Sequence, residues 1–174
     1  MAKLRVVLVE DLASDAELIA REVKRAGHDA EIRRVQQEAD LLDALRTFAP
    51  DLVLSDHSLP QFSARDTLRV VARAAPGLPV IVVTGSLEEE TAAEYIRAGA
   101  TDYVVKERLH RLGPAIARAL ELKIARAEQA RAEARFRALI GISRPTSTSS
   151  SRPSNWASTT PRCIGPIDRS RSRR

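Results

Sequence analysis

The chain is poor in cysteine and in aromatic residues. Cys163 is the only cysteine among 174 residues, which excludes an internal disulfide and favours a reducing, cytoplasmic compartment. One Trp, two Tyr and three Phe leave the core to Val, Leu, Ile and Ala, a composition that suits parallel strands buried on both faces. No apolar stretch approaches about 20 residues, and the first residues run into a short apolar segment, so neither a membrane span nor a signal peptide is expected.

The net charge of +5 hides a division of charge along the chain. Residues 1–106 carry 13 basic and 18 acidic side chains, a net of −5, whereas residues 107–174 carry 15 and 5, a net of +10. A nucleic-acid-binding protein that acts through its Arg-rich tail is therefore one alternative. Trp156 is the only tryptophan and offers little base stacking, so nucleic acid is not the favoured partner.

Apolar periodicity predicts an α/β domain. Strand-like runs alternate with helical patterns: the runs at 4–9, 30–35, 52–55, 79–83 and 102–105, the patterns at 14–26, 37–48, 64–74, 87–97 and 109–140. Five such units predict one doubly wound parallel sheet. Ser14 and Ser86 each precede a glutamate by three residues and are interpreted as helix caps, and Gly27 and Gly99 as residues that end helices.

The C-terminal third divides into a helix and a tail. The last helix is expected to begin proper at Pro114 and to run roughly 40 Å to Ile140, at about 1.5 Å per residue. We expect a globular domain over 1–122, a helical extension over 123–140 and a disordered Ser/Pro/Arg-rich tail over 141–174. The extension is either a solvated arm or one of two paired helices in a homodimer.

Polar side chains follow four of the predicted strands. They are Glu10 with Asp11, then Asp56, Thr84 and Lys106. Because the carboxyl ends of parallel strands meet at one edge of a sheet, we expect these side chains to lie together. Three carboxylates, a hydroxyl and an ammonium indicate a site for a divalent cation such as Mg²⁺ and for a phosphoryl group.

The crowding of carboxylates suggests roles within this site. Asp56, beside Glu10 and Asp11, would become an ionised nucleophile once a cation is bound. Lys106 would pair with phosphoryl oxygens or neutralise the carboxylates, two roles that do not exclude each other, and Thr84 would donate a hydrogen bond.

Residues 3–122 resemble the receiver domain of two-component response regulators. The resemblance rests on four segments in the order and spacing of that family: Val9-Glu10-Asp11, Asp56-His57-Ser58-Leu59-Pro60, Val83-Thr84-Gly85 and the run from Ala98 to Lys106. It implies a flavodoxin-like, five-stranded sheet of order 2-1-3-4-5.

The resemblance also implies an activity. Asp56 would accept a phosphoryl group from the histidine of a kinase or phosphotransfer protein, which makes the chain a phosphoacceptor rather than an enzyme, with hydrolysis of its own acyl phosphate. Asp11, Asp56 and the Ser58 carbonyl would coordinate Mg²⁺, with Glu10 helping through water, and Lys106 would contact the phosphoryl group.

The family's switch pair would be Thr84 and Tyr103, which reshape the surface of the fourth helix, fifth strand and fifth helix. The chain departs from the family at Ala64, where glycine is common; a positive φ there would cost about 1 kcal/mol. Glu107 replaces the usual proline after the lysine. His57, beside the acceptor, is expected to be a surface residue rather than a general base.

Two further interpretations stay open. An aspartate-nucleophile phosphohydrolase has a similar sheet, but Ser58 occupies the place of its second acid. Residues 134–140 are similar to the helix that leads into PAS domains of receiver-linked signalling proteins. The chain is thus a stand-alone receiver with a genuine tail, or a receiver–PAS protein whose reading frame shifts near codon 141.

Overall fold

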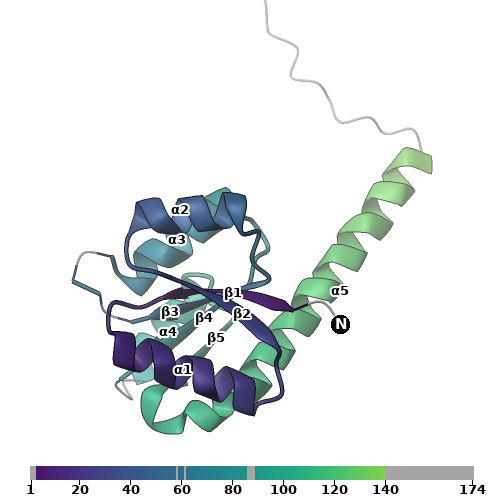
Figure 1. Ribbon diagram of the computed structural model, residues 1–174. Coiled ribbons are helices and arrows are strands. Elements are labelled where there is room, and N and C mark those ends of the chain that lie inside the picture. Colours follow the sequence, from purple (N-terminus) through teal and green to yellow (C-terminus); the bar gives the residue numbers. More distant parts are fainter. Residues whose placement is uncertain (1–2, 58, 61, 86–88, 140–174) are drawn as a thin grey trace, which may run out of the picture.

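The computed structural model describes residues 3–57, 59–60, 62–85 and 89–139. Five strands alternate with helices along this part of the chain (Figure 1). The strands are β1 (Leu4–Val9), β2 (Ala30–Val35), β3 (Leu52–Asp56), β4 (Val80–Thr84) and β5 (Asp102–Val105). The helices are α1 (Ala13–Arg25), α2 (Glu38–Thr47), α3 (Ala64–Ala74), α4 (Glu89–Arg97), the 3₁₀ helix η1 (Lys106–Arg111) and α5 (Leu112–Leu139).

The strands form one parallel sheet of order β2-β1-β3-β4-β5, which confirms the predicted fold. Strand β2 lies on one side of β1, and β3 lies on the other. The strand order therefore changes direction between β1 and β3, and α/β sheets bind their ligands at such a point. In the register, Val9 lies opposite Ser55, Asp56 opposite Val83 and Thr84 opposite Val105. The carboxyl ends of β1, β3 and β4 therefore lie at one level.

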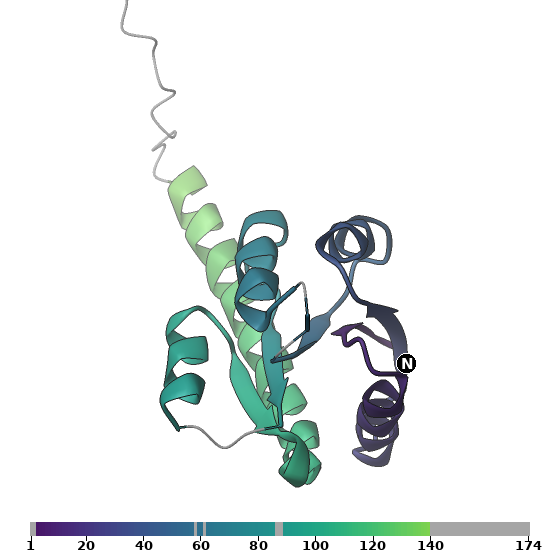
Figure 2. The ribbon, with the colours of Figure 1, turned by 90° about the vertical axis from the view of Figure 1, so that its left-hand side faces the viewer.

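Helices cover both faces of the sheet because strand side chains alternate between the faces. Val7 and Val53 belong to an apolar cluster with side chains of α2, α3 and α4, and Leu8 and Leu54 to a second cluster with α1 and α5. Figure 2 shows α2 and α3 on one side of the sheet and α1 on the other. Aliphatic residues and alanine make up most of both clusters, as the scarcity of aromatics predicts.

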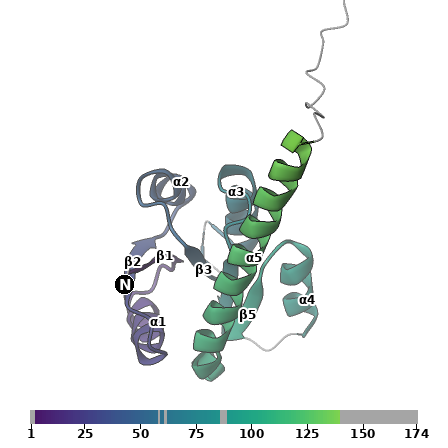
Figure 3. The same cartoon turned by 90° about the vertical axis from the view of Figure 1, so that its right-hand side faces the viewer.

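Helix α5 outruns the sheet, as the sequence predicts. Its first turns are buried at Leu112 and Ile116, whereas Phe136 is 63% and Leu139 84% exposed, and Figures 1 and 3 show its far end projecting beyond the domain. The helix begins two residues before the expected Pro114, which lies in the first turn, where a missing N–H is tolerated. Across the described ranges, no helix combines the length and apolarity that crossing a membrane requires.

The predicted cap of α1 is wrong. Ser14 lies inside the first turn, and Leu12 occupies the N-cap position without a side-chain cap bond. The Leu12 amide instead donates to Glu10 Oε1 at 3.0 Å, so the carboxylate fixes the loop and the helix begins at Ala13. The other predicted cap, Ser86, lies outside the described residues. Gly27 has φ 86°, the left-handed conformation expected after a helix end.

Helix α3 has a capping box that the sequence analysis did not identify. The Ser63 hydroxyl accepts from the Asp66 amide at 3.3 Å, and the Asp66 carboxylate accepts from the Ser63 amide at 3.1 Å. Ala64 is the first residue of this helix, and Ala49 is the one described non-glycine residue with positive φ. The strain considered for Ala64 therefore does not arise.

Candidate functional site

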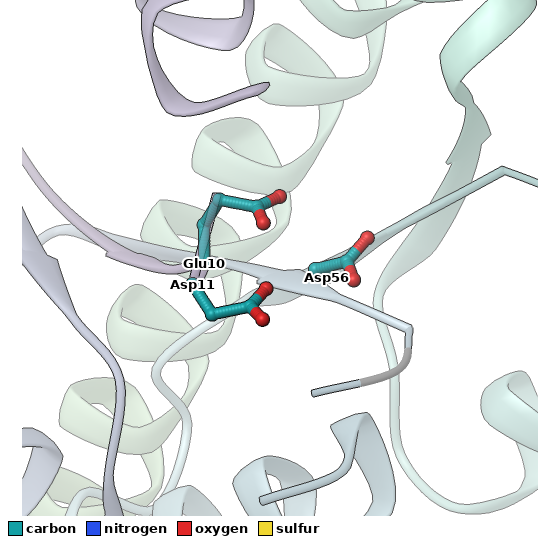
Figure 4. Close-up of side chains that lie close together, drawn as sticks. All are labelled: Glu10, Asp11 and Asp56. Carbon is teal, nitrogen blue, oxygen red and sulfur yellow. The ribbon is translucent and has the colours of Figure 1, made fainter. Parts of the chain in front are cut away.

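Three carboxylates meet at the carboxyl edge of the sheet. Glu10 and Asp11 follow β1, and Asp56 ends the neighbouring β3. One carboxylate oxygen from each lies within 4.8 Å of the others, and Figure 4 shows the three side chains close together, with their carboxylates extending to the same side. Glu10 is fully buried and Asp56 is 8% exposed. The predicted convergence of these residues is therefore present.

Lys106 is the cation of this cluster. It follows β5 directly and begins η1. Its Nζ lies 2.9 Å from Asp56 Oδ1, 3.2 Å from Glu10 Oε2 and 2.5 Å from Asp15 Oδ2. In this structure the ammonium thus neutralises carboxylates, one of the two roles that the sequence left open.

Asp15 was missed as a member of the site. It stands in the first turn of α1, where an acidic residue has an ordinary explanation in the helix dipole. Its spacing of four residues from Asp11 was the only available signal, because the approach of Lys106 depends on how α1 packs beside η1.

Burial and charge shift the pKa values of these groups. Burial raises the pKa of Glu10, and the nearby Asp56 charge adds to this, while the hydrogen bond from the Leu12 amide opposes it. Burial alone would lower the pKa of Lys106, but its bonds to Asp15 and Asp56 outweigh burial and raise it. The same contact with Lys106 holds the pKa of Asp15 below its usual value. Lys106 therefore stays charged at neutral pH.

The carboxylate cluster fits a small, hard cation. Mg²⁺ binds oxygen at about 2.0–2.1 Å with octahedral geometry, so neighbouring ligand oxygens lie roughly 3 Å apart. Glu10, Asp11 and Asp56 supply only oxygen donors, and one oxygen of each lies within 4.8 Å of the others, close to this spacing. The predicted fourth ligand, the Ser58 carbonyl, lies outside the described residues.

The predicted switch residues lie on β4 and β5. Thr84 ends β4 and is 5% exposed, and it lies opposite Val105, next to Lys106. Tyr103 lies in β5 opposite Val82 and is half-buried against the cluster shared with α2, α3 and α4.

His57 is not the surface residue that the sequence predicts. It is half-buried, its Nδ1 is hydrogen-bonded to the Tyr95 hydroxyl, and the two rings meet edge to face at 5.6 Å and 81°. Tyr95 lies in α4 and is 4% exposed. Nothing in the sequence indicated this pair, since the two residues are 38 positions apart.

The fold and the acidic edge define a receiver domain, and comparison with known proteins agrees. The response regulator receiver domain matches residues 6–116, and the chain belongs to this family. It is 35% identical over 99 residues to the regulatory protein LuxO of Vibrio vulnificus, a match that covers 57% of this chain and 21% of that protein.

Other relatives support the same assignment. The DNA-binding response regulator MtrA of Mycobacterium tuberculosis is 32% identical over 102 residues, which cover 59% of this chain and 43% of MtrA. The crystal structure of the receiver domain of NtrX from Brucella abortus superposes with a TM-score of 0.60 at 31% identity, over 67% of this chain and 98% of that domain. The chain thus spans less than half the length of the two curated relatives.

Proposed function

We propose that Asp56 accepts a phosphoryl group from a histidine kinase or phosphotransfer protein, in a cytoplasmic, Mg²⁺-dependent reaction. One observation carries this proposal: the Asp56 carboxylate lies 2.9 Å from the Lys106 ammonium and has the carboxylates of Glu10 and Asp11 within 4.8 Å. A nucleophile, a cation for phosphoryl oxygens and a set of metal ligands are thereby side by side.

The chemistry is an in-line transfer at phosphorus. A carboxylate oxygen of Asp56 forms a bond to phosphorus while the bond from phosphorus to the donor's imidazole nitrogen breaks, and the electron pair stays on that nitrogen. Glu10, Asp11 and Asp56 would hold Mg²⁺, which supplies positive charge to the phosphoryl oxygens. Lys106 supplies the second positive charge, and it stays protonated because its carboxylate partners raise its pKa.

The product would change the surface around α4, β5 and α5. Under this proposal the Thr84 hydroxyl moves to a phosphoryl oxygen and Tyr103 turns toward the vacated space. Two observations support this: Thr84 lies opposite the residue before Lys106, and Tyr103 lies opposite Val82, two residues before Thr84 on the same strand. A partner protein would read the altered surface.

A second copy of the chain is a further proposed partner, through α5. Phe136 and Leu139 lie about one turn apart and are largely exposed, so pairing of two distal helices would bury them. A mass in sedimentation equilibrium near twice 19.1 kDa would support this, and a monomer mass would contradict it.

The proposal is tested by phosphoryl labelling. The full chain is incubated with a radiolabelled, autophosphorylated histidine kinase or with acetyl phosphate, with and without MgCl₂. We expect base-labile label in the wild type, and none in Asp56→Asn or in EDTA. Asp51→Asn is the matched control, because Asp51 stands just before the same strand and should leave labelling intact. Undiminished labelling of Asp56→Asn would refute the assignment, and steady phosphate release from simple esters would favour a phosphohydrolase.

A further inference from the structure

The hydrogen bond between His57 and Tyr95 connects the residue next to the acceptor with α4. The Tyr95 ring is buried, 4% exposed, within the cluster that α3 and α4 share. Burial raises the pKa of its hydroxyl, so the group stays protonated and donates to Nδ1 or accepts from it. The edge-to-face contact of the two rings adds a packing interaction.

The backbone of His57 is held in place on both sides. Its amide donates to the Val83 carbonyl of β4 at 2.9 Å, and its carbonyl accepts from the Ala64 amide at the start of α3 at 3.3 Å. The imidazole therefore projects from a fixed point at the edge of the sheet. Any change in the distance between the two rings would come from a shift of α4, which carries Tyr95.

Helix α4 also contacts α3 through an ion pair between Arg65 and Glu94. That pair is exposed, with 63% and 49% of the two side chains accessible, so it contributes little to holding the helix. The His57–Tyr95 bond is the more buried of the two connections, and we expect it to dominate.

We propose that the His57–Tyr95 pair holds α4 in its resting position and opposes the shift that phosphorylation of Asp56 produces. The inference rests on the proposed function of Asp56. The opposing element is Thr84, five residues before the start of α4, so we expect movement of its hydroxyl toward a phosphoryl group to favour the shifted position of α4. The His57–Tyr95 pair contacts the second half of α4, in which Tyr95 lies.

Under this proposal the His57–Tyr95 contact and phosphorylation of Asp56 act on the same helix in opposite directions. Their effects on each other are then reciprocal by thermodynamic linkage. Loss of the Tyr95 hydroxyl makes the shifted position of α4 easier to reach, and a phosphoryl analogue then binds more tightly at Asp56. A net hydrogen bond of ordinary strength corresponds to about a fivefold change in affinity.

The test compares beryllofluoride binding, in excess MgCl₂, to the ¹⁵N-labelled full chain, followed by NMR. We expect Tyr95→Phe to bind this phosphoryl analogue about fivefold more tightly than the wild type, and its α4 amides to exchange faster with solvent before the analogue is added. Glu94→Gln is the matched control, because it breaks the neighbouring exposed connection, and its affinity should equal that of the wild type.

A double-mutant cycle separates the pair from local effects. His57→Leu removes the other half of the hydrogen bond, and Tyr95→Phe in that background should give no further gain. Equal or weaker binding by Tyr95→Phe, or additive effects of the two substitutions, would overturn the inference. If the wild type itself binds no beryllofluoride, the proposed function of Asp56 fails, a result distinct from unchanged binding in Tyr95→Phe.

Discussion

Replacing Lys106 with methionine should destabilise the metal-free protein and strengthen Mg²⁺ binding. Methionine keeps most of the side-chain length but removes the charge that faces Asp56 at 2.9 Å and the fully buried Glu10 at 3.2 Å. Loss of one partner from a buried ionic group costs 3–5 kcal/mol, and the 20% exposure of Lys106 places this case at about 3 kcal/mol.

Magnesium should offset most of that loss. With the ammonium gone, the carboxylates attract a cation more strongly and no longer have a competing partner, so we expect Mg²⁺ to bind at least about tenfold more tightly than in the wild type. A ligand at 100 times its dissociation constant stabilises the folded state by about 2.7 kcal/mol, close to the free energy removed.

The assay is urea unfolding at about pH 7.5 in EDTA and across a MgCl₂ titration. Lys123→Met is the matched control: Lys123 Nζ contacts the Asp51 carboxylate and carbonyl, both at 3.2 Å, but the two side chains are 33% and 35% exposed. This control should cost less than about 1 kcal/mol without altering Mg²⁺ affinity. The reasoning is refuted if Lys106→Met is no less stable than the control, or if its Mg²⁺ affinity does not rise.

Two further predictions concern the scaffold. An ideal Cβ on Gly113 would lie 2.6 Å from Ala26 Cβ, so Gly113→Ala should lower the urea-unfolding free energy by about 2 kcal/mol, and Ala26→Gly should restore most of it; strictly additive effects would contradict this contact. Hydrogen bonds from the Ser63 hydroxyl and amide hold the pKa of Asp66 below its usual value, so its stabilisation is fully present above the ordinary aspartate pKa and is lost as the pH falls through the lowered one. Asp66→Ala should therefore cost about 1 kcal/mol at about pH 7 and progressively less as the pH is lowered through the acid range, and a pH-independent difference in urea unfolding would disprove this.

The strands could be predicted closely because their apolar runs are short and end in polar residues. Asp56 and Thr84, expected just after their strands, are instead the last residues of β3 and β4, where they pair with Val83 and Val105. The prediction of Ser14 as the cap of α1 was wrong because the Glu10 carboxylate accepts the hydrogen bond from the Leu12 amide. The position of that carboxylate depends on the whole site and not on the local Ser-x-x-Glu pattern.

The convergence of Glu10, Asp56 and Lys106 follows from topology alone, because each stands at, or directly after, the carboxyl end of a strand of one parallel sheet. The placement of Asp15 and Tyr95 does not, because both reach the site from helices. Which helical side chain faces the edge depends on the helix's rotation and height on the sheet, and those depend on packing across both layers. Sequence periodicity gives the buried face of a helix but not which of its polar residues lies against a particular strand end.

The Asp15 contact also constrains how Lys106 can act. An ammonium has three protons to donate, and in this structure it already has three carboxylate partners: Asp15, Asp56 and Glu10. A phosphoryl oxygen on Asp56 would take the place of the Asp56 carboxylate among these partners, or displace one of the other two. Asp15 has the most accessible side chain, 27% against 11% for Asp56 and none for Glu10, so water can best replace its bond. Release of Asp15 would free the first turn of α1, and the phosphoryl group would thereby act on α1 as well as on α4.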